Sequence, residues 1–216
     1  MLTPSIPRIV LWRHGQTDWN IENRFQGHTD IPLNNVGKFQ VDHAAKILIG
    51  MNPLKIISSD LLRTRETAQA LSDISGVPVS IDPDLRETNG GHWEGRTGDE
   101  NRANDAENFL SWLHGADIPA GGVGERRSEV AARAMRSIEN QMANATGTVV
   151  FVTHGGTARC IIGSILNLPF EHWSRVGGLS NASWSVLEKN AMGRWYLAEH
   201  NAGSIPEPNF GNESGS

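Results

Sequence analysis

Two apolar runs along the chain end on the same polar pair of residues. Residues 8–13 are mostly apolar, and this run is followed by His14 and a glycine. Residues 147–153 are mostly apolar and β-branched, and this second run is followed by His154 and Gly155. Short continuous apolar runs of this kind are typical of strands that are buried on both faces. The pattern predicts two such strands, each with a histidine at its carboxyl end.

The rest of the chain alternates between helical and strand spacing of its apolar residues. Helices are expected over residues 34–49 (with Asn34 or Asn35 as cap), 60–75, 106–114, 125–144 and 156–166. Further strands are expected over residues 55–59, 77–81, 182–189 and 193–200, the last two as a hairpin. Strands that alternate with helices predict an α/β fold, a three-layer sandwich with a mainly parallel central sheet and helices on both faces.

The length of 216 residues suits a single α/β domain, which we place over residues 1–200. Residues 86–124 are irregular apart from one short helical segment, so we interpret them as a small lid-like insertion. Residues 201–216 are polar and rich in proline and glycine, which predicts a mobile C-terminal tail.

Composition excludes several classes of protein. The formal net charge is −5, so no global charge draws the chain to nucleic acid or to an anionic membrane. No window approaches 18 apolar residues, and the first residues lack the pattern of a signal peptide. The single cysteine, Cys160, rules out an internal disulfide and fits a reducing compartment. We therefore expect a cytoplasmic protein that binds a small molecule.

Chemically active side chains follow several of the predicted strands. In open α/β sheets, ligands bind outside the carboxyl ends of the strands. Arg13 and His14 end the first strand, and His154 ends a later one. Arg63 lies in the first turn of a helix just after a strand, and Glu87 follows another extended segment. We expect these five side chains to meet at one edge of the sheet.

This set of residues fits few chemistries. The chain has no G-x-S-x-G elbow and Cys160 lies within a predicted helix, which disfavours acyl transfer. It has no G-x-x-x-x-G-K-[ST] loop for a nucleotide phosphate. Two histidines and a glutamate could bind zinc, but neighbouring arginines would repel a cation.

Two arginines beside two histidines are instead typical of a site for a phosphoryl group. A neutral imidazole can attack phosphorus and form a phosphohistidine. The departing alkoxide then needs a proton, for which Glu87 is the candidate donor. Burial or the incoming phosphate would have to raise the pKa of Glu87 for this role. Asp84, Glu94 and Asp99 are rival acids, but the strand-end position favours Glu87.

Four segments, "RHGQTDWN", "SSDLLRTRETA", "LRETNGGHWEG" and "THGG", together resemble the histidine phosphatase superfamily, the phosphoglycerate mutase-like enzymes. The resemblance implies that His14 is phosphorylated and that Glu87 is the proton donor. It also implies that Arg13, Arg63 and His154 hold the phosphoryl group and that no metal or other cofactor is needed.

The same resemblance implies further contacts with the substrate. Asn20 would touch the phosphoryl group, and Gln26 and Gly27 lie where the loop after the nucleophile approaches the substrate. Gly155 is a phosphate-binding candidate because glycine lets backbone N–H groups come close to a ligand. Thr17 either supports this loop or is a plain helix cap.

The segments "GERRSEVAAR", "VGGLSNASWSVL" and "RWYLAEHNAG" resemble the glucosyl-3-phosphoglycerate phosphatases. This resemblance implies hydrolysis of glucosyl-3-phosphoglycerate to glucosylglycerate, on the route to methylglucose lipopolysaccharides, by a homodimer. The chain departs from the family at Thr64, where alanine is usual, and at Arg126, where a small serine is usual.

Other functions remain open from the sequence. The motifs describe the phosphate and not the alcohol, so a phosphatase for α-ribazole phosphate or phosphoserine, or one of broad specificity, is an alternative. A phosphoglycerate mutase is a further enzyme alternative, and an inactive module that binds phosphorylated ligands is a non-enzyme one. Trp93, Trp112, Trp173 and Trp184 are expected to pack in the interior, or one of them to line a glucosyl pocket.

Overall fold

A single six-stranded sheet forms the centre of the computed structural model, which describes residues 7–203. Its strands lie in the order β3-β2-β4-β1-β5-β6. Their bounds are β1 Arg8–Arg13, β2 Pro53–Ser58, β3 Val79–Ile81, β4 Thr148–Thr153, β5 Trp184–Lys189 and β6 Trp195–Ala202. The first four strands pair in parallel, whereas β5 and β6 form an antiparallel hairpin on β1. The predicted α/β class and its mainly parallel sheet are confirmed.

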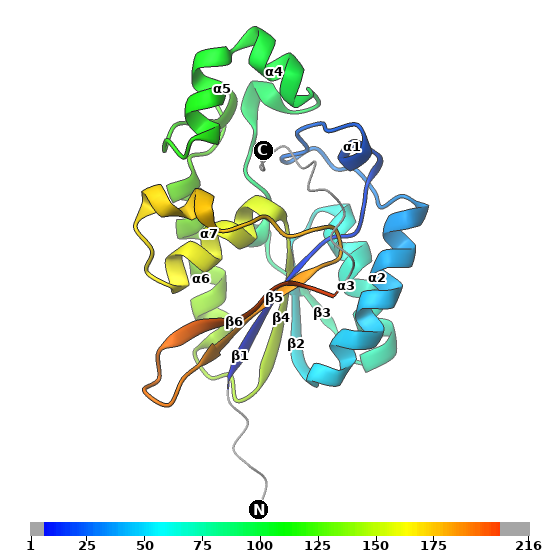
Figure 1. Ribbon diagram of the computed structural model, residues 1–216. Helices are drawn as coiled ribbons and strands as arrows, with labels where there is room; N and C mark the ends of the chain where they lie inside the picture. The colour runs from blue at the N-terminus through cyan, green and yellow to red at the C-terminus, as the bar shows by residue number, and fades with distance from the viewer. Residues whose placement is uncertain (1–6, 204–216) are drawn as a thin grey trace, which may run out of the picture.

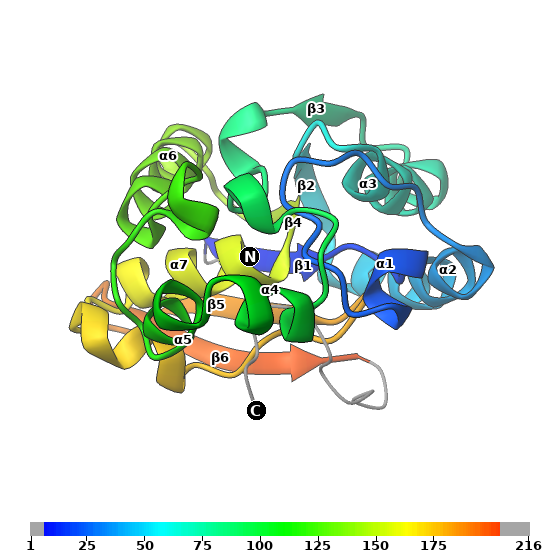
Figure 2. The same ribbon diagram turned by 90° about the horizontal axis from the view of Figure 1, so that it is seen from above.

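Helices cover both faces of this sheet (Figure 1, Figure 2). One face carries α2, Asn35–Leu48, and α3, Leu62–Ser75. The other face carries α6, Arg127–Met142, and α7, Gly155–Ile165. The three-layer arrangement agrees with the helical periods in the sequence.

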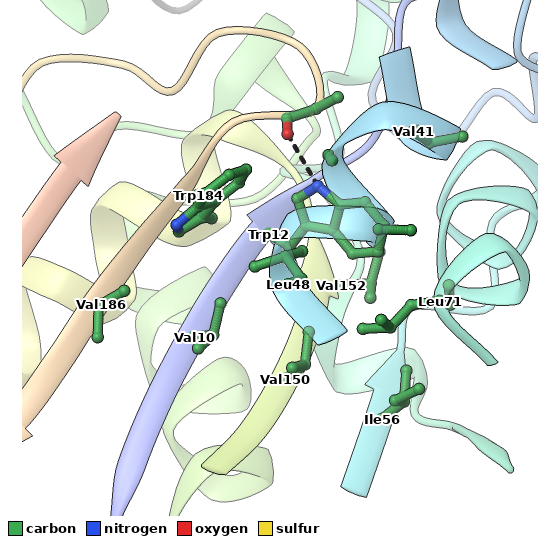
Figure 3. Packing of buried hydrophobic residues seen from close by; sticks show 14 of the residues in the cluster. Val10, Trp12, Val41, Leu48, Ile56, Leu71, Val150, Val152, Trp184 and Val186 are labelled. Carbon is green, nitrogen blue, oxygen red and sulfur yellow. Dashed lines mark hydrogen bonds between the residues drawn. The ribbon is translucent and has the colours of Figure 1, made fainter. Parts of the chain in front are cut away.

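The central strands are buried on both faces because their side chains alternate between two apolar cores. In β1, Val10 and Trp12 join the core beneath α2 and α3, which Figure 3 shows from close by. Ile9 and Leu11 join the core beneath α6 and α7. The indole Nε1 of Trp12 donates to the carbonyl of Ala182 at 2.9 Å, so its one polar atom is satisfied. This packing fixes the end of β1, where His14 follows.

Two glycines let α2 approach the loop after His14. A Cβ atom on Gly37 would lie 2.1 Å from the carbonyl oxygen of Gln16, and one on Gly15 would lie 2.6 Å from that of Gly37. Only residues without a side chain allow this contact. The loop that carries His14 is therefore held directly against the start of α2.

The segment interpreted as a lid-like insertion lies above the carboxyl ends of the parallel strands (Figure 1), and we call it the lid. It holds α4, Gly98–Asn104, and α5, Ala106–Leu113, of which only α5 was predicted. The signal for α4 was readable, since Thr97 and Glu100 form a capping box at its start. The lid has its own aromatic core, made by Phe25, Trp93, Phe109 and Trp112.

Smaller differences from the expected elements concern their ends. A four-residue helix, α1 Asp18–Ile21, lies in the segment expected to be a loop. The strand β6 continues through Ala202, where Ala202 pairs with Trp184. Residues 204–216, most of the predicted mobile tail, lie outside the described residues. Within residues 7–203, no helix is both long enough and apolar enough to cross a membrane.

Candidate active site at the carboxyl ends of β1 and β4

His14 is a buried and neutral histidine at the end of β1. Its Nδ1–H donates to the carbonyl of Gly15 at 2.7 Å. Burial lowers the pKa of His14 well below 6.5, and the positive charges of Arg63 and Arg13 lower it further. The ring therefore carries its single proton on Nδ1, which leaves the lone pair of Nε2 available for attack on an electrophile.

His154 ends β4 and lies against His14, with 5.3 Å between the two ring centroids. Arg63 Nε–H donates to its Nδ1 at 3.3 Å, so the proton sits on Nε2, 3.1 Å from the Ser59 hydroxyl. Burial, followed by the charge of Arg63, lowers the pKa of His154 well below 6.5. His154 is also the N-cap of α7, whose first residue is the buried Gly155.

Arg63 is fully buried although it carries a full positive charge. Its Nη2 donates to the carbonyl of Gly27 at 2.8 Å and its Nη1 to that of Thr29 at 2.9 Å. Burial lowers its pKa to about 10, which still keeps the guanidinium charged at neutral pH. The two carbonyl groups hold this cation beside the histidines.

Arg13 supplies the second positive charge. It is 7% exposed, and its Nη1 donates to the carbonyl of Leu179. Its charge reaches His14, His154 and Arg63, since it lowers the pKa of all three groups. Two guanidinium groups beside two neutral imidazoles make a site for an anion and not for a cation.

The carboxylate of Glu87 lies at the N-terminal end of α7. The backbone N–H groups of Thr88, Gly156 and Thr157 donate to it at 2.8, 3.1 and 3.2 Å. The Thr157 hydroxyl is 3.2 Å from Oε1, and the charge of Glu87 is felt by Arg63. These donors and the helix dipole favour the ionised carboxylate when no ligand is bound.

Thr17 acts as the cap of α1. Its side chain and that of Asn20 form a reciprocal capping box, which leaves the Asn20 Oδ1 facing the Thr17 backbone. Asn181 Nδ2 donates to the same Oδ1 at 3.1 Å and to the carbonyl of His14 at 3.3 Å. The Thr17 hydroxyl also donates to this Oδ1 at 3.0 Å, so three donors fix the orientation of the Asn20 amide beside the loop of His14.

Gln26 and Gly27 lie on the loop that holds Arg63. Gln26 is 8% exposed, and its Oε1 has no hydrogen-bond partner among residues 7–203. Gly27 has φ +50, and a Cβ atom there would lie 2.0 Å from Glu94 Oε1. The backbone of Gly27 can therefore bind Arg63 and touch Glu94 at the same time.

The sequence interpretation missed the part that Glu94 plays. Its Oε1 accepts from the backbone N–H groups of His28 and Gly90, each at 2.9 Å. Its Oε2 accepts from the backbone and the hydroxyl of Thr29, at 3.1 and 2.7 Å. Glu94 thus ties the loop that binds Arg63 to the base of the lid. Its partners His28 and Thr29 are about 65 residues away in the chain, so no local signal could have shown this link.

The structure separates the other two rival acids from the site. Asp84 pairs with Arg136 on α6, with 2.8 Å between Nη2 and Oδ1. The side chain of Asp99 is 97% exposed on the lid. Of the four candidates, Glu87 is the one whose carboxylate shares the start of α7 with His154.

Ser59 is a second residue that the sequence interpretation missed. It is fully buried directly after β2 and faces His154. The rule that placed His14 and His154 at strand ends would also have found Ser59, because it ends the apolar run of β2.

The two residues that depart from the family pattern, Thr64 and Arg126, both donate hydrogen bonds to backbone carbonyls. Thr64 is buried, and its hydroxyl donates to the carbonyls of Leu61 and Ser59 at 2.7 and 3.0 Å. Arg126 is the residue before α6, and its guanidinium donates to the carbonyl of Asp117.

All four tryptophans considered as sugar platforms pack in apolar cores. Trp93 and Trp112 lie in the aromatic core of the lid, and Trp184 lies in the core beneath α2 and α3. Trp173 packs with Val130, Ala131 and Cys160, and it also lines a cavity. Among residues 7–203, no three His, Cys, Asp or Glu side chains are grouped in a way that could hold a metal ion.

Comparison with known proteins places this site in a family. A family model for the histidine phosphatase superfamily (branch 1) matches residues 9–203. A curated glucosyl-3-phosphoglycerate phosphatase of Mycolicibacterium vanbaalenii is 40% identical over 190 residues, which cover 84% of each chain. A curated probable phosphoglycerate mutase, GpmB of Photorhabdus laumondii, is 34% identical over 185 residues, again 84% of each chain.

Comparison with solved structures gives the same family. Mycobacterial glucosyl-3-phosphoglycerate phosphatase in complex with VO3 matches with a TM-score of 0.85 and 38% identity. The match covers 91% of this chain and 99% of that chain. The family match spans the strands that carry both histidines, and the fold is shared over nearly the full length. The chain therefore belongs to the histidine phosphatase superfamily, branch 1.

Proposed function

We propose that this protein is a phosphomonoesterase that works through a phosphohistidine at His14. The observation that carries the proposal is the state of His14, a neutral ring with its proton fixed on Nδ1 and with two guanidinium groups beside it. Such a ring is an available nucleophile, and the arginines attract the dianion that it must attack.

The reaction takes two balanced steps. His14 Nε2 attacks phosphorus, the bond from phosphorus to the alcohol oxygen breaks, and Glu87 gives its proton to the departing oxygen. Water then attacks the phosphohistidine, Glu87 takes a proton from this water, and inorganic phosphate leaves. General acid catalysis of this kind contributes roughly 10²–10⁴ in rate.

Glu87 has to gain a proton before the first step. The donors around its carboxylate favour the ionised form in the absence of a ligand. A phosphate dianion placed against it favours the protonated form, because two negative groups in contact repel. The bound substrate therefore prepares its own acid.

Arg13, Arg63 and the backbone N–H of Gly155 at the start of α7 hold the oxygens of the phosphoryl group. Asn20 adds its Nδ2 group, because its Oδ1 is already fixed by other donors. Gln26 contributes its buried amide. The direct contact of His154 with the phosphoryl group stays a prediction, since Arg63 and Ser59 engage both of its nitrogens here.

The substrate that we propose is glucosyl-3-phosphoglycerate, which would give glucosylglycerate and phosphate. The support is the 40% identity to a curated phosphatase of that name and the match to a solved one. From the resemblance of the sequence to the glucosyl-3-phosphoglycerate phosphatases we further propose a homodimer that acts in the synthesis of methylglucose lipopolysaccharides, and the single cysteine supports a cytoplasmic location.

Phosphate release by the purified, EDTA-treated protein tests the substrate. Glucosyl-3-phosphoglycerate, 3-phosphoglycerate, phosphoserine and α-ribazole phosphate are compared in parallel. We expect kcat/KM for the glucosylated compound to exceed that for each of the other three substrates by about a hundredfold. This ratio needs only ~2.7 kcal/mol of differential binding in the transition state. Slow and equal turnover of all four would contradict the narrow specificity and leave a phosphatase of broad specificity.

The relative named as a probable phosphoglycerate mutase makes mutase activity the second candidate. A mutase of this kind needs 2,3-bisphosphoglycerate and interconverts 3- and 2-phosphoglycerate without net release of phosphate. We expect net release and no dependence on 2,3-bisphosphoglycerate. If 3-phosphoglycerate were isomerised faster than phosphate is released, the protein would be a mutase.

A further inference from the structure

A cavity of about 150 Å³ lies beside the active site, between the end of α5 and the segment after α7. Two arginines, Arg127 at the start of α6 and Arg159 on α7, line it. The same two arginines also line a much smaller cavity of about 10 Å³, together with Thr88 and Gly156. Thr88 and Gly156 both donate to Glu87 through their backbone N–H groups. The two arginines therefore line both cavities, and the smaller cavity also borders two backbone donors to Glu87.

Two chain segments connect this cavity to the active site. Along α7, Arg159 lies three residues beyond Gly156, an axial rise of about 4.5 Å that keeps the two residues on the same side of the helix. Along the segment before β5, Gly177 and Gly178 line the cavity, and the carbonyl of Leu179 next to them binds Arg13. Because Glu87 is the proposed proton donor, the leaving alcohol would lie next to it, and the Thr88 and Gly156 groups that donate to Glu87 line the smaller cavity.

Both arginines are held in fixed positions. Each is only 8% exposed. Arg127 lies over the Trp112 ring, 3.8 Å from its centroid, and its Nη1 donates to the Trp112 carbonyl at 2.6 Å. Arg159 Nε donates to the carbonyl of Val176 at 2.9 Å. Guanidinium groups that are anchored in this way lose little entropy when they bind an anion.

The remaining walls are aromatic and backbone surfaces. Phe170 and Trp173 line the cavity, with 4.8 Å between their ring centroids. The positive charges of the two arginines favour a ligand with a negative group. The aromatic wall beside them favours a ligand whose negative group lies next to an apolar or sugar-like face. Inorganic phosphate lacks such a face, whereas a phosphorylated hydroxy acid has a carboxylate a few bonds from its phosphate.

We propose that Arg127 and Arg159 bind the carboxylate of the leaving alcohol and so select phosphorylated hydroxy acids. This assignment deepens the proposed function and rests on it. Arg159 provides the more direct test, because Arg127 also supports the lid through Trp112.

The experiment compares substrates that differ only in the carboxylate. Glucosyl-3-phosphoglycerate is paired with its carboxamide, and 3-phosphoglycerate with glycerol 3-phosphate. We expect the wild-type protein to prefer the charged member of each pair in kcat/KM by about tenfold or more, the usual effect of a hydrogen bond to a charged group. Arg159→Gln should abolish this preference, mainly through KM, and Arg159→Lys should restore part of it.

The controls separate this role from a structural one. Arg175→Gln removes an exposed arginine from the neighbouring 3-10 helix and should leave both preferences unchanged. Thermal unfolding of each variant shows whether the fold is intact, and Arg127→Gln provides a second reading of the same preference.

Two results would overturn the inference. One is a wild-type protein that turns over both members of each pair equally, and the other is an Arg159→Gln protein that keeps the preference. Failure of the proposed substrate looks different. The glucosyl group would then bring no advantage, but 3-phosphoglycerate would still exceed glycerol 3-phosphate in a way that depends on Arg159.

Discussion

At the scale of single residues, the charge state of His14 decides the chemistry. A histidine on the surface would be partly protonated near pH 6.5 and would then have no lone pair to offer. Burial and two neighbouring arginines keep this ring neutral, and the Gly15 carbonyl fixes which nitrogen is free. The same arginines that bind the anion thus also keep the nucleophile ready.

The lowered pKa of His14 predicts how activity depends on pH. Because the folded protein holds this pKa well below 6.5, the nucleophile is neutral at pH 6.5 and loses its lone pair only as pH falls through the lower value. The substrate phosphate itself titrates near pH 6, so its effect on kcat/KM is corrected for first. After this correction we expect kcat/KM below pH 6.5 to stay at its neutral-pH value. NMR titration of the His14 ring checks the assignment. An imidazole of His14 that titrates at 6.5 or above would refute this account.

The proposed acid can be tested through the leaving group. Glu87→Gln cannot donate a carboxyl proton, so alkyl phosphates should lose about 10²–10⁴ in kcat, the usual range for general acid catalysis. Turnover of p-nitrophenyl phosphate should fall far less, because its phenolate leaves without a proton. An equal loss on both substrates would argue against Glu87 as the acid.

Most of the candidate site could be predicted from the sequence, because the main residues lie where strands end. His14, Arg63 and His154 follow this rule, and the fold brings them together at one edge of the sheet. Glu94 could not be found in this way, since its partners lie on a loop far away in the chain. A contact between distant loops depends on how the lid packs, and no local period encodes it.

At the scale of elements, the start of α7 and the loop of residues 26–29 position the site. The start of α7 supplies N–H groups to Glu87 and carries His154 as its cap. The loop supplies the carbonyls that hold Arg63. Glu94 connects this loop to the lid, so the lid and the cation site form one unit.

Glu94→Gln should therefore weaken the site without removing any reacting group. An amide cannot accept all four hydrogen bonds, and leaving buried donors unsatisfied costs about 1–3 kcal/mol each. We expect a lower melting temperature and a drop of about tenfold in kcat/KM that is equal for alkyl and p-nitrophenyl phosphates. The exposed Glu107→Gln on α5 is the matched control and should change neither. A normal kcat/KM in Glu94→Gln would contradict the positioning role.

Regular elements were easier to predict than the lid. Strands β1 and β4 and helix α2 have continuous apolar periods, and each was predicted to within a residue or two of its observed bounds. The lid helix α4 has a single buried residue, Asn101, and therefore no apolar stripe. Only its capping box marks this helix in the sequence.

At the scale of the whole molecule, the three layers hold the carboxyl ends of the strands rigid and leave the lid to cover them (Figure 2). The two apolar cores fix β1 and β4 side by side, and this pairing sets His14 against His154. The phosphoryl site thus depends on the sheet, whereas we propose that the segments around α7 recognise the alcohol.

The most direct test is to trap the phosphorylated protein. Wild-type protein is mixed with substrate, quenched within the first turnovers at alkaline pH and digested, and the phosphorylated peptide is identified by mass spectrometry. The account predicts phosphate on the peptide that contains His14, and neither this peptide nor turnover in the His14→Ala variant. Phosphate on another residue, or a His14→Ala variant that still turns over, would contradict it.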